Sequence, residues 1–551
     1  MDMKNLNYIF LFTCTLVFFS CKKDVIESEP LQNLKEDNVF DPTDSIGFYT
    51  EQYLNGIYAN IPVGYNRISS NYLDAGSDDA IASALNTTVE RFTRSTLTSN
   101  NNPDDAYAKN YAGIRSANIL LANMDKINLI ASNAANKGYW KAEARFLRSL
   151  LYFELIKRYG GVPLIGDKVF NYTDDMNIAR NTYDECVNYI VTECDAIIPD
   201  LRTDPIDNTN LGRATKGAAM ALKAKALLYA ASPLFNVNND LDKWKAAYTA
   251  AEDITKIATG KFALETSYIN AFTSRTSREI IFAQQQANNN TVEYANAPVG
   301  YIANNTTSQG QTSPTEELVR AFEMANGKSI DDNTSGYIAS NPYAGRDPRF
   351  YLTIFHNGMT WLGRPVETFD GGKDRPGGVA RQTRTGYYAR KFLGNNPSGS
   401  TYATVTHNFP IFRYAEVLLN FAEAKNEFSG PAEDVFAAVE SIRRRAGLSP
   451  FAIARTKTKD ELREVIRHER RVEMAFEEQR FWDIRRWKIA EQVLNKPLTG
   501  IRITKNATTG ALTYTRENVI TAVFTAPKMY LYPLPYSEVV KSDKLIQNTG
   551  W

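Results

Sequence analysis

Apolar residues recur at helical spacing over two long stretches of the chain, and the clearest pattern covers residues 140–159, which contain no Gly or Pro. Two adjacent apolar stripes run along this segment: Trp140, Ala144, Leu147, Leu151 and Leu155 in the first, and Phe146, Leu150 and Phe153 in the second. An apolar face this wide predicts a helix covered on more than one side by helical neighbours. Gly160 and Gly161 end it, and Val162-Pro163 forces an extended exit.

The same spacing predicts further helices on both sides of this segment. They cover residues 44–60, 104–127, 182–198, 215–231 and 244–259, and then 412–428, 432–446, 459–476 and 481–494. Thr182, with Glu185 three residues later, matches a capping box at the start of one helix. Paired helices with short connections predict a mainly α fold with tetratricopeptide-like stacking, at about residues 44–260 and 411–495.

The polar pattern changes over residues 262–410, where Asn, Gly and Thr are frequent, apolar runs are short and helical periodicity is weak. Residues 316–325 form the clearest short helix there, and we expect a few short strands. A loop-rich insertion of this length in a helical scaffold is typical of a functional segment. The tail, residues 496–551, carries Pro533 and Pro535, which predict an extended run.

Composition limits the function classes. The chain has 551 residues, of which 43% are hydrophobic and 23% charged, and its formal net charge is +1 with no long basic run. A nucleic-acid partner would require a clustered positive face, so this class is disfavoured. The chain is rich in aromatic residues, which we expect mostly in the core and partly in a binding surface.

The four cysteines do not predict a disulfide framework. Cys186 and Cys194 are eight residues apart on one predicted helix, so their Cα atoms would lie about 12 Å apart at helical rise. That separation is too long for a disulfide. We expect free, buried thiols.

The N-terminus predicts a lipoprotein signal peptide over residues 1–20 and a single body over residues 21–551. Lys4 precedes an apolar run, Tyr8–Phe19, which is too short to span a membrane. Ser20-Cys21 resembles the end of a bacterial lipobox, although Phe19 is bulkier than the residue usual there. Cys21 would then be lipidated and hold the body at a membrane surface. The alternatives are a plain secretory signal and an uncleaved anchor.

Five stretches, in order along the chain, resemble the SusD/RagB family of surface lipoproteins, which serve nutrient import in Bacteroidetes-type bacteria. They are KAEARFLRSLLYFELIKRYGGVPLI, RATKGAAMALKAKALLYAASPLFN, FPIFRYAEVLLNFAEAKNE, RHERRVEMAFEEQRFWDIRRW and YLYPLPYSEVVKSDKLIQNTGW. The resemblance implies one α-rich body at the outer membrane, facing the exterior. It also implies that the protein caps a SusC-like TonB-dependent transporter barrel and hands it a ligand, commonly an oligosaccharide.

The fourth of these stretches is dense in charge. Arg470, Arg471, Arg480, Arg485 and Arg486 alternate with Glu469, Glu473, Glu477, Glu478 and Asp483. An anion site is one interpretation. We favour a network of ion pairs on and between helices, because charges of alternating sign usually pair.

No catalytic or metal motif is present. The three histidines lack metal-ligand spacing, and the chain contains no nucleophile elbow, P-loop or dinucleotide fingerprint. We therefore predict no catalytic residue, no metal and no cofactor. A structural calcium ion at Asp78-Asp79 or Asp331-Asp332 is the alternative. A surface hydrolase stays open, because the paired acids of glycoside hydrolases follow no spacing rule.

By position, residues 61–102 and 284–315 match the ligand-binding loops of the family. A sugar site combines aromatic faces with amide or carboxylate groups for the hydroxyls. The candidates are Tyr65, Tyr72, Asp78, Asp79, Tyr294, Asn296 and Tyr301, with Trp361 outside both loops. Neither loop contains tryptophan, which departs from the starch-binding type of the family. The alternative for each aromatic is a place in the core.

These observations lead to one hypothesis with three rivals. The hypothesis is a lipid-anchored, non-enzymatic protein that binds glycans and delivers them to the transporter barrel. The rivals are a binder of peptides or other nutrients, a helical-repeat scaffold that docks only proteins, and a surface hydrolase.

Overall fold

The computed structural model describes residues 36–303, 305–377, 381–394 and 401–551. The predicted signal peptide and Cys21 lie outside these ranges and stay predictions.

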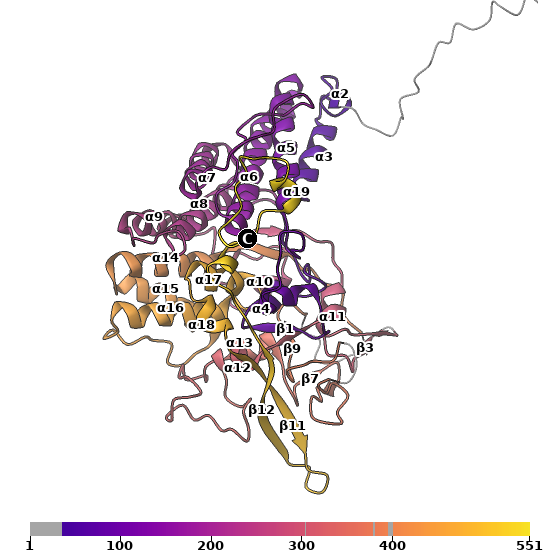
Figure 1. Cartoon of the computed structure of the whole chain (residues 1–551), viewed down its shortest axis with the longest axis vertical. Helices are drawn as coiled ribbons and strands as arrows, with labels where there is room; N and C mark the ends of the chain where they lie inside the picture. Colours follow the sequence, from indigo (N-terminus) through magenta and orange to yellow (C-terminus); the bar gives the residue numbers. More distant parts are fainter. Residues whose placement is uncertain (1–35, 304, 378–380, 395–400) are drawn as a thin grey trace, which may run out of the picture.

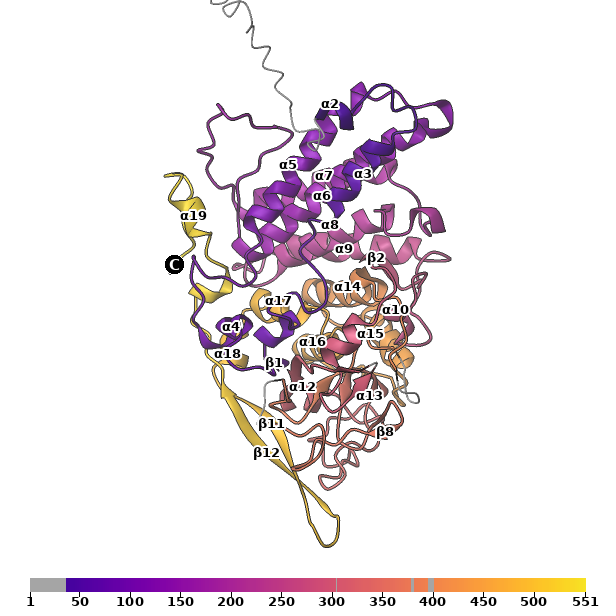
Figure 2. The same cartoon turned by 90° about the vertical axis from the view of Figure 1, so that its right-hand side faces the viewer.

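The first half of the chain folds into a layer of antiparallel helices (Figure 1). These are α2 (Glu36–Val39), α3 (Phe48–Tyr58), α5 (Tyr107–Asn123), α6 (Ala134–Tyr159), α7 (Tyr183–Ile197), α8 (Lys216–Ala231) and α9 (Leu241–Ile257). The short helix α4 (Arg91–Arg94) lies apart from this layer, next to residues 73–76 (Figures 1 and 2). From α5 to α9, each long helix packs against the next in sequence. Both predicted stripes of α6 are buried, which confirms that helical neighbours cover it.

A second group of helices continues the layer. It consists of α14 (Tyr414–Ser429), α15 (Glu433–Ala446), α16 (Lys459–Glu473), α17 (Gln479–Arg486) and α18 (Ala490–Leu494). Because α9 packs against α14, the stack continues across the long insertion between them. The prediction of one helix over residues 481–494 is wrong: Lys488 has a positive φ of 56°, and this separates α17 from α18. The mainly α, tetratricopeptide-like fold is confirmed.

The segment between the two groups is built from short elements. Its helices are α10 (Asn270–Thr273), α11 (Thr291–Asn296), α12 (Glu316–Ala321) and α13 (Pro348–Thr353). Its strands are β2 (Ile280–Gln284), β3 (Ile302–Ala303), β4 (Thr306–Thr307), β5 (Thr312–Pro314), β6 (Ile354–Phe355), β7 (Thr360–Trp361), β8 (Arg364–Pro365), β9 (Tyr388–Ala389) and β10 (Phe409–Arg413). They pair antiparallel as β10–β2, β3–β4, β6–β9 and β7–β8, and β5 pairs with β1 (Ala80–Ala82).

The tail contains a hairpin that the sequence analysis missed. Strands β11 (Pro497–Lys505) and β12 (Leu512–Thr521) pair antiparallel and project from the lower end of the molecule (Figures 1 and 2). Alternating Ile501 and Ile503, followed by the turn residues NATTG, carried the signal for a hairpin. The prediction of an extended tail, based on Pro533 and Pro535, is therefore wrong for residues 497–521.

Two local predictions are confirmed. Thr182 and Glu185 form a reciprocal capping box at the start of α7. Cys186 and Cys194 are free and buried.

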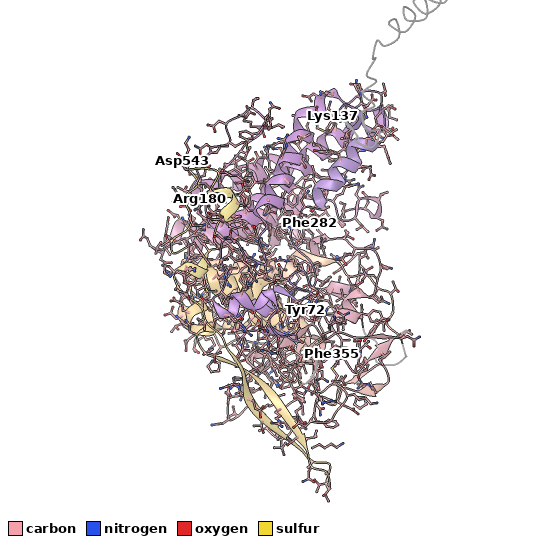
Figure 3. All side chains as sticks on the ribbon, turned by 45° about the vertical axis from the view of Figure 1, so that its right-hand side comes forward. Tyr72, Lys137, Arg180, Phe282, Phe355 and Asp543 are labelled. Atoms are coloured by element: carbon pink, nitrogen blue, oxygen red, sulfur yellow. The ribbon has the colours of Figure 1, made fainter. Side chains whose placement is uncertain are left out.

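Phe282 on β2 joins the two helical groups, and it is labelled near the middle of the molecule in Figure 3. Its ring lies 5.2 Å from the Phe146 ring of α6, edge to face, and 6.4 Å from the Phe412 ring of β10. Aromatic pairs of this kind add stability beyond the area that they bury. The β10–β2 ladder therefore connects the insertion to both helical groups. Within the described residues, no helix has the length and apolarity needed to cross a membrane.

Replacement of Gly161 by Ala should destabilise the fold, because a Cβ at this position would collide with the backbone carbonyl oxygen of Asn181. We expect a loss of about 1–3 kcal/mol in the free energy of unfolding. Gly138→Ala is the matched control, since Gly138 lies in α6 with nothing within 4 Å of its added Cβ. It should gain up to about 1 kcal/mol from helix propensity. Thermal unfolding of both variants checks this, and shifts of the same sign would contradict it.

Candidate ligand-binding face

The two loops assigned to ligand binding lie side by side. Strand β1 in the first loop pairs with β5 in the second, with Ala80 opposite Pro314 and Ala82 opposite Thr312. Next to this ladder, the Ser83 amide donates to the carbonyl oxygen of Gln311. Two segments more than 200 residues apart in the sequence thus share one short sheet.

A second connection is a reciprocal amide pair. Asn66 Nδ2 donates to Asn296 Oδ1 at 3.0 Å, and Asn296 Nδ2 donates to Asn66 Oδ1 at 2.9 Å. Asn296 is fully buried, at the end of α11. This candidate therefore holds the two loops together and presents no surface to a ligand in this structure.

The aromatic candidates of the first loop pack inward. The hydroxyl of Tyr65 donates to the carbonyl oxygen of Asn408 at 3.0 Å, and its ring lies 4.9 Å from that of Phe392. Tyr72 is buried against Phe392 and Phe476. Both residues therefore belong to the core, which was the alternative to ligand binding for each aromatic candidate.

The remaining aromatic candidates are also held by protein groups. Tyr294 is half-buried and donates its hydroxyl to the Ala303 carbonyl oxygen at 2.8 Å. Tyr301 is 3% exposed, and the Arg364 guanidinium covers its ring at 3.6 Å. Trp361 is fully buried. Tyr301 and Trp361 therefore present no open ring face for stacking on a sugar, and Tyr294 is only partly accessible.

Asp78 and Asp79 face arginines. Asp78 accepts two hydrogen bonds from Arg480, at 2.8 and 2.9 Å, and Arg471 contacts both carboxylates, at 3.1 and 2.6 Å. Burial alone would raise the pKa of Asp78, but the two guanidinium groups outweigh it and lower that pKa. These acids anchor the first loop to the start of α17 and the end of α16. Of the two positions named for calcium, Asp78-Asp79 is thus already supplied with positive charge.

The charged segment at residues 467–487 forms the ion pairs that its alternating signs predicted, and they are buried. Arg413 on β10 lies at the centre, 2.7 Å from Glu279, 2.7 Å from Glu473 and 2.6 Å from Glu477. Arg349 joins the same group through Glu469 and Glu473, at 2.5 and 3.0 Å. All of these side chains are almost fully inaccessible to solvent.

Charges from α17 extend this network. Arg486 pairs with Glu423 of α14 at 2.5 Å and with Asp483 at 2.8 Å, and Trp487 donates to Glu423 at 2.7 Å. Burial would raise the pKa of Glu423, but the Arg486 guanidinium lowers it to about 2. Arg485, unlike Arg486, contacts an aromatic ring: its guanidinium stacks 3.6 Å over the Phe481 ring. Burial lowers the pKa of Arg485 to about 10.

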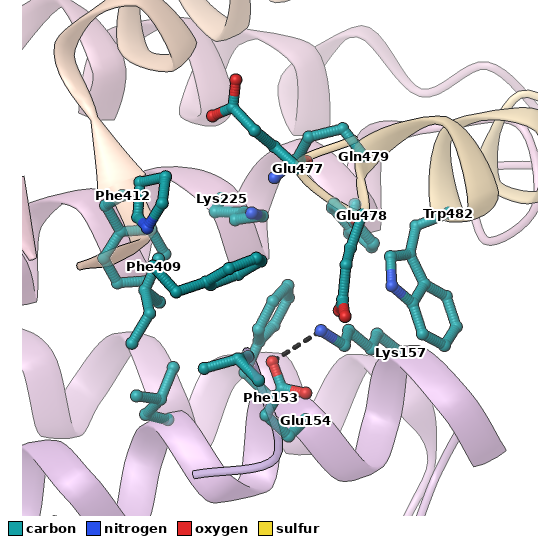
Figure 4. Close-up of a pocket in the computed structure, with 15 residues that line it drawn as sticks. Phe153, Glu154, Lys157, Lys225, Phe409, Phe412, Glu477, Glu478, Gln479 and Trp482 are labelled. Carbon is teal, nitrogen blue, oxygen red and sulfur yellow. Dashed lines mark hydrogen bonds and ion pairs between the residues drawn. The ribbon is translucent and has the colours of Figure 1, made fainter. Parts of the chain in front are cut away.

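A small cavity lies between α6, β10 and the start of α17 (Figure 4). Lys157 and Glu154 form an ion pair there at 2.6 Å, beside Glu478 and the Trp482 ring. Burial lowers the pKa of Lys157 to about 8. The free volume is about 20 Å³, which accommodates a water molecule but not a sugar ring. This cavity belongs to the charged core.

The histidines and acids do not gather into a metal site. Within the described part of the chain, no group of three or more His, Cys, Asp or Glu side chains could hold a metal ion. His407 Nε2 lies 2.9 Å from Glu293, both fully buried, and burial lowers the pKa of His356 to about 4. Both histidines are packed in the interior.

The residues that the two loops expose to solvent are not the ones predicted to bind the ligand. Each loop exposes one large aliphatic side chain, Leu85 at 68% and Ile302 at 64%. Small polar residues accompany them: Ser69, Ser70, Asn86 and Thr96 in the first loop, and Asn288, Thr291, Thr306 and Thr307 in the second. We define these residues as the loop face. Sequence reasoning missed Leu85 and Ile302 because it searched for aromatic rings.

Arg413→Met should destabilise the protein strongly, since it leaves Glu279, Glu473 and Glu477 buried with less positive charge. Loss of one partner of a buried ion pair costs about 3–5 kcal/mol. Arg502→Met is the control, because Arg502 and its partner Asp370 are about half exposed. It should leave the free energy of unfolding nearly unchanged, because solvent screens exposed ion pairs. Chemical denaturation measures both variants, and equal losses would contradict the central role of Arg413.

Comparison with known proteins supplies the family. A family model described as "SusD family" matches residues 278–551, and one described as "Starch-binding associating with outer membrane" matches residues 33–228. SusD-like protein P2 of Formosa agariphila is 27% identical over 458 residues, covering 80% of this chain and 78% of that protein.

Two solved structures from Bacteroides fragilis share the fold. A SusD-like protein is 27% identical with a TM-score of 0.77, covering 94% of this chain and 100% of the other. A SusD-like carbohydrate binding protein is 25% identical with a TM-score of 0.75, covering 91% and 99%. The helical stack, the paired loops and the two family matches agree, and the chain belongs to the SusD/RagB family.

Proposed function

We propose that this protein binds oligosaccharides or polysaccharides at the outer membrane and delivers them to a TonB-dependent transporter, without chemical turnover. Cys21 would carry the lipid that holds it at the exterior surface. The observation that carries the proposal is the joining of the two loops of the family's ligand-binding positions into one face by the β1–β5 ladder. The carbohydrate-binding relative of similar fold supports it.

The loop face suits a binder of sugars. Leu85 and Ile302 would offer aliphatic surface for the CH side of a pyranose, and the exposed hydroxyl and amide groups of the same two loops would offer partners for its hydroxyls. The buried tyrosines and Asn296 act indirectly, because they hold the loops in position.

The acids of the first loop favour binding over hydrolysis. Asp78 and Asp79 are buried and paired with Arg471 and Arg480. A glycosidase needs two carboxyl groups that flank the scissile bond, one of them ready to donate a proton. Because the arginines lower the pKa of Asp78, this residue is a poor proton donor near neutral pH. Burial raises the pKa of Asp79, but the same burial keeps its carboxyl group away from a substrate.

Leu85→Ser combined with Ile302→Ser should weaken glycan binding roughly tenfold, by removing aliphatic contact with the sugar. Both side chains are exposed, so stability should hardly change. Isothermal titration with a glycan selected from an array measures the affinity.

The matched control for this pair is Ile338→Ser. Ile338 is 58% exposed and lies outside both loops, so its loss should leave the affinity unchanged. An equal effect from the control, or no effect from the pair, would count against the loop face.

The transporter partner can be tested in native membranes. Solubilisation in mild detergent and affinity purification of the tagged protein should recover a large TonB-dependent barrel as the main companion. A Cys21→Ala variant should lose membrane attachment. Recovery of other surface proteins without a barrel would favour the protein-docking scaffold.

A further inference from the structure

A pocket of about 180 Å³ opens between residues 204–215, the segment after α9 and residues 275–285. It lies beside the second loop, because Gln285 of that loop lines it. Gly212 faces Gln285 so closely that a Cβ would collide with that side chain. The volume is below the range of about 300–1,000 Å³ that is usual for pockets holding drug-sized molecules. It suits one substituted sugar residue of a longer chain.

Three cations of this pocket have no carboxylate partner. Lys261, Arg275 and Arg278 line it. Arg275 donates to the carbonyl oxygen of Gln286 at 2.8 Å, which directs its guanidinium toward the second loop. Within the described residues, none of the three forms an ion pair, although arginines elsewhere in the fold are extensively paired.

The nearby acids are occupied by other groups. Asp204 accepts from the Gly217 amide at 2.8 Å; burial raises its pKa, and the positive charge of Lys261 offsets part of that rise. Glu265 accepts from the backbone amide of Arg278 at 2.9 Å and from Ser277 at 2.9 Å. Arg213, the fourth cation of the pocket, is paired with Glu143 at 3.0 Å. The positive charge of Arg275 and Arg278 therefore stays available, and Lys261 adds charge that it shares with Asp204.

We propose that this pocket binds an anionic substituent, a sulfate ester or a carboxylate, on the glycan that the protein captures. Guanidinium groups match both oxyanions in geometry, and hydrogen bonds between charged partners are the strong ones. Lys261, Arg275 and Arg278 would donate to the anion while the sugar chain continues along the second loop. The inference rests on the proposed glycan-binding function and narrows its ligand class to acidic glycans.

The test compares charged and neutral forms of one backbone. Dextran sulfate oligosaccharides are titrated against dextran oligosaccharides, and oligogalacturonate against its methyl ester, with the full mature protein. We expect the charged member of at least one pair to bind roughly tenfold more tightly or better. The preference should decrease with added salt. The first pair reports on sulfate and the second on carboxylate.

The triple variant Lys261→Gln, Arg275→Gln and Arg278→Gln tests whether the cations of the pocket cause this preference. It should abolish the preference for the charged member. The control, Lys109→Gln with Lys245→Gln and Lys544→Gln, removes the same charge from exposed positions outside the pocket and should retain it. A preference that survives in the pocket variant, or that falls equally in the control, overturns the inference.

The neutral members separate this inference from the proposed function. Equal binding of charged and neutral members contradicts the anion pocket and leaves glycan binding intact. Absence of binding by all four probes contradicts the inference as well. Binding of inorganic sulfate alone, with no preference among the glycans, would identify an adventitious ion only and overturn it.

Discussion

Buried charge is the constraint on which the arrangement of this protein depends. Glu279, Glu473 and Glu477 lie in the interior, and all three contact the guanidinium of Arg413. Removing an ion from water is expensive, and only close partners of opposite sign offset the cost. These residues come from distant parts of the chain, so the charges are satisfied only when the insertion and the second helical group have both reached their final positions.

The same rule ties the loop face to the scaffold. Arg471 and Arg480 meet Asp78 and Asp79 of the first loop, and Arg67 of that loop meets Glu478. The ladder β1–β5 then connects the first loop to the second. A segment that has the sequence character of a solvated helix surface is in fact the support behind the ligand face. Its charged side chains pair with residues of other elements. Helix spacing alone would have predicted pairs along one helix.

Much of the scaffold was predictable because its signal is local. The apolar stripes of α6, the capping box at Thr182 and the glycine stop after Tyr159 each depend on a few neighbouring residues. The site was less predictable because burial is a property of the whole fold. Tyr301 and Trp361 have the residue types of a sugar platform, but Arg364 covers the first and the strands of the insertion enclose the second. The β11–β12 hairpin also had a local signal, the alternating Ile501 and Ile503 followed by a turn, but the prolines of the tail favoured an extended segment instead.

In this proposal the ligand binds at the face formed by residues 61–102 and 284–315. Hydrogen–deuterium exchange of the mature protein, with and without a bound oligosaccharide, tests it most directly, since exchange reports local protection of the backbone. We expect bound oligosaccharide to slow the exchange of backbone amides in these two loops and in the adjoining pocket at residues 275–285. Protection confined to helices α9, α14 and α15, with both loops unchanged, would contradict it.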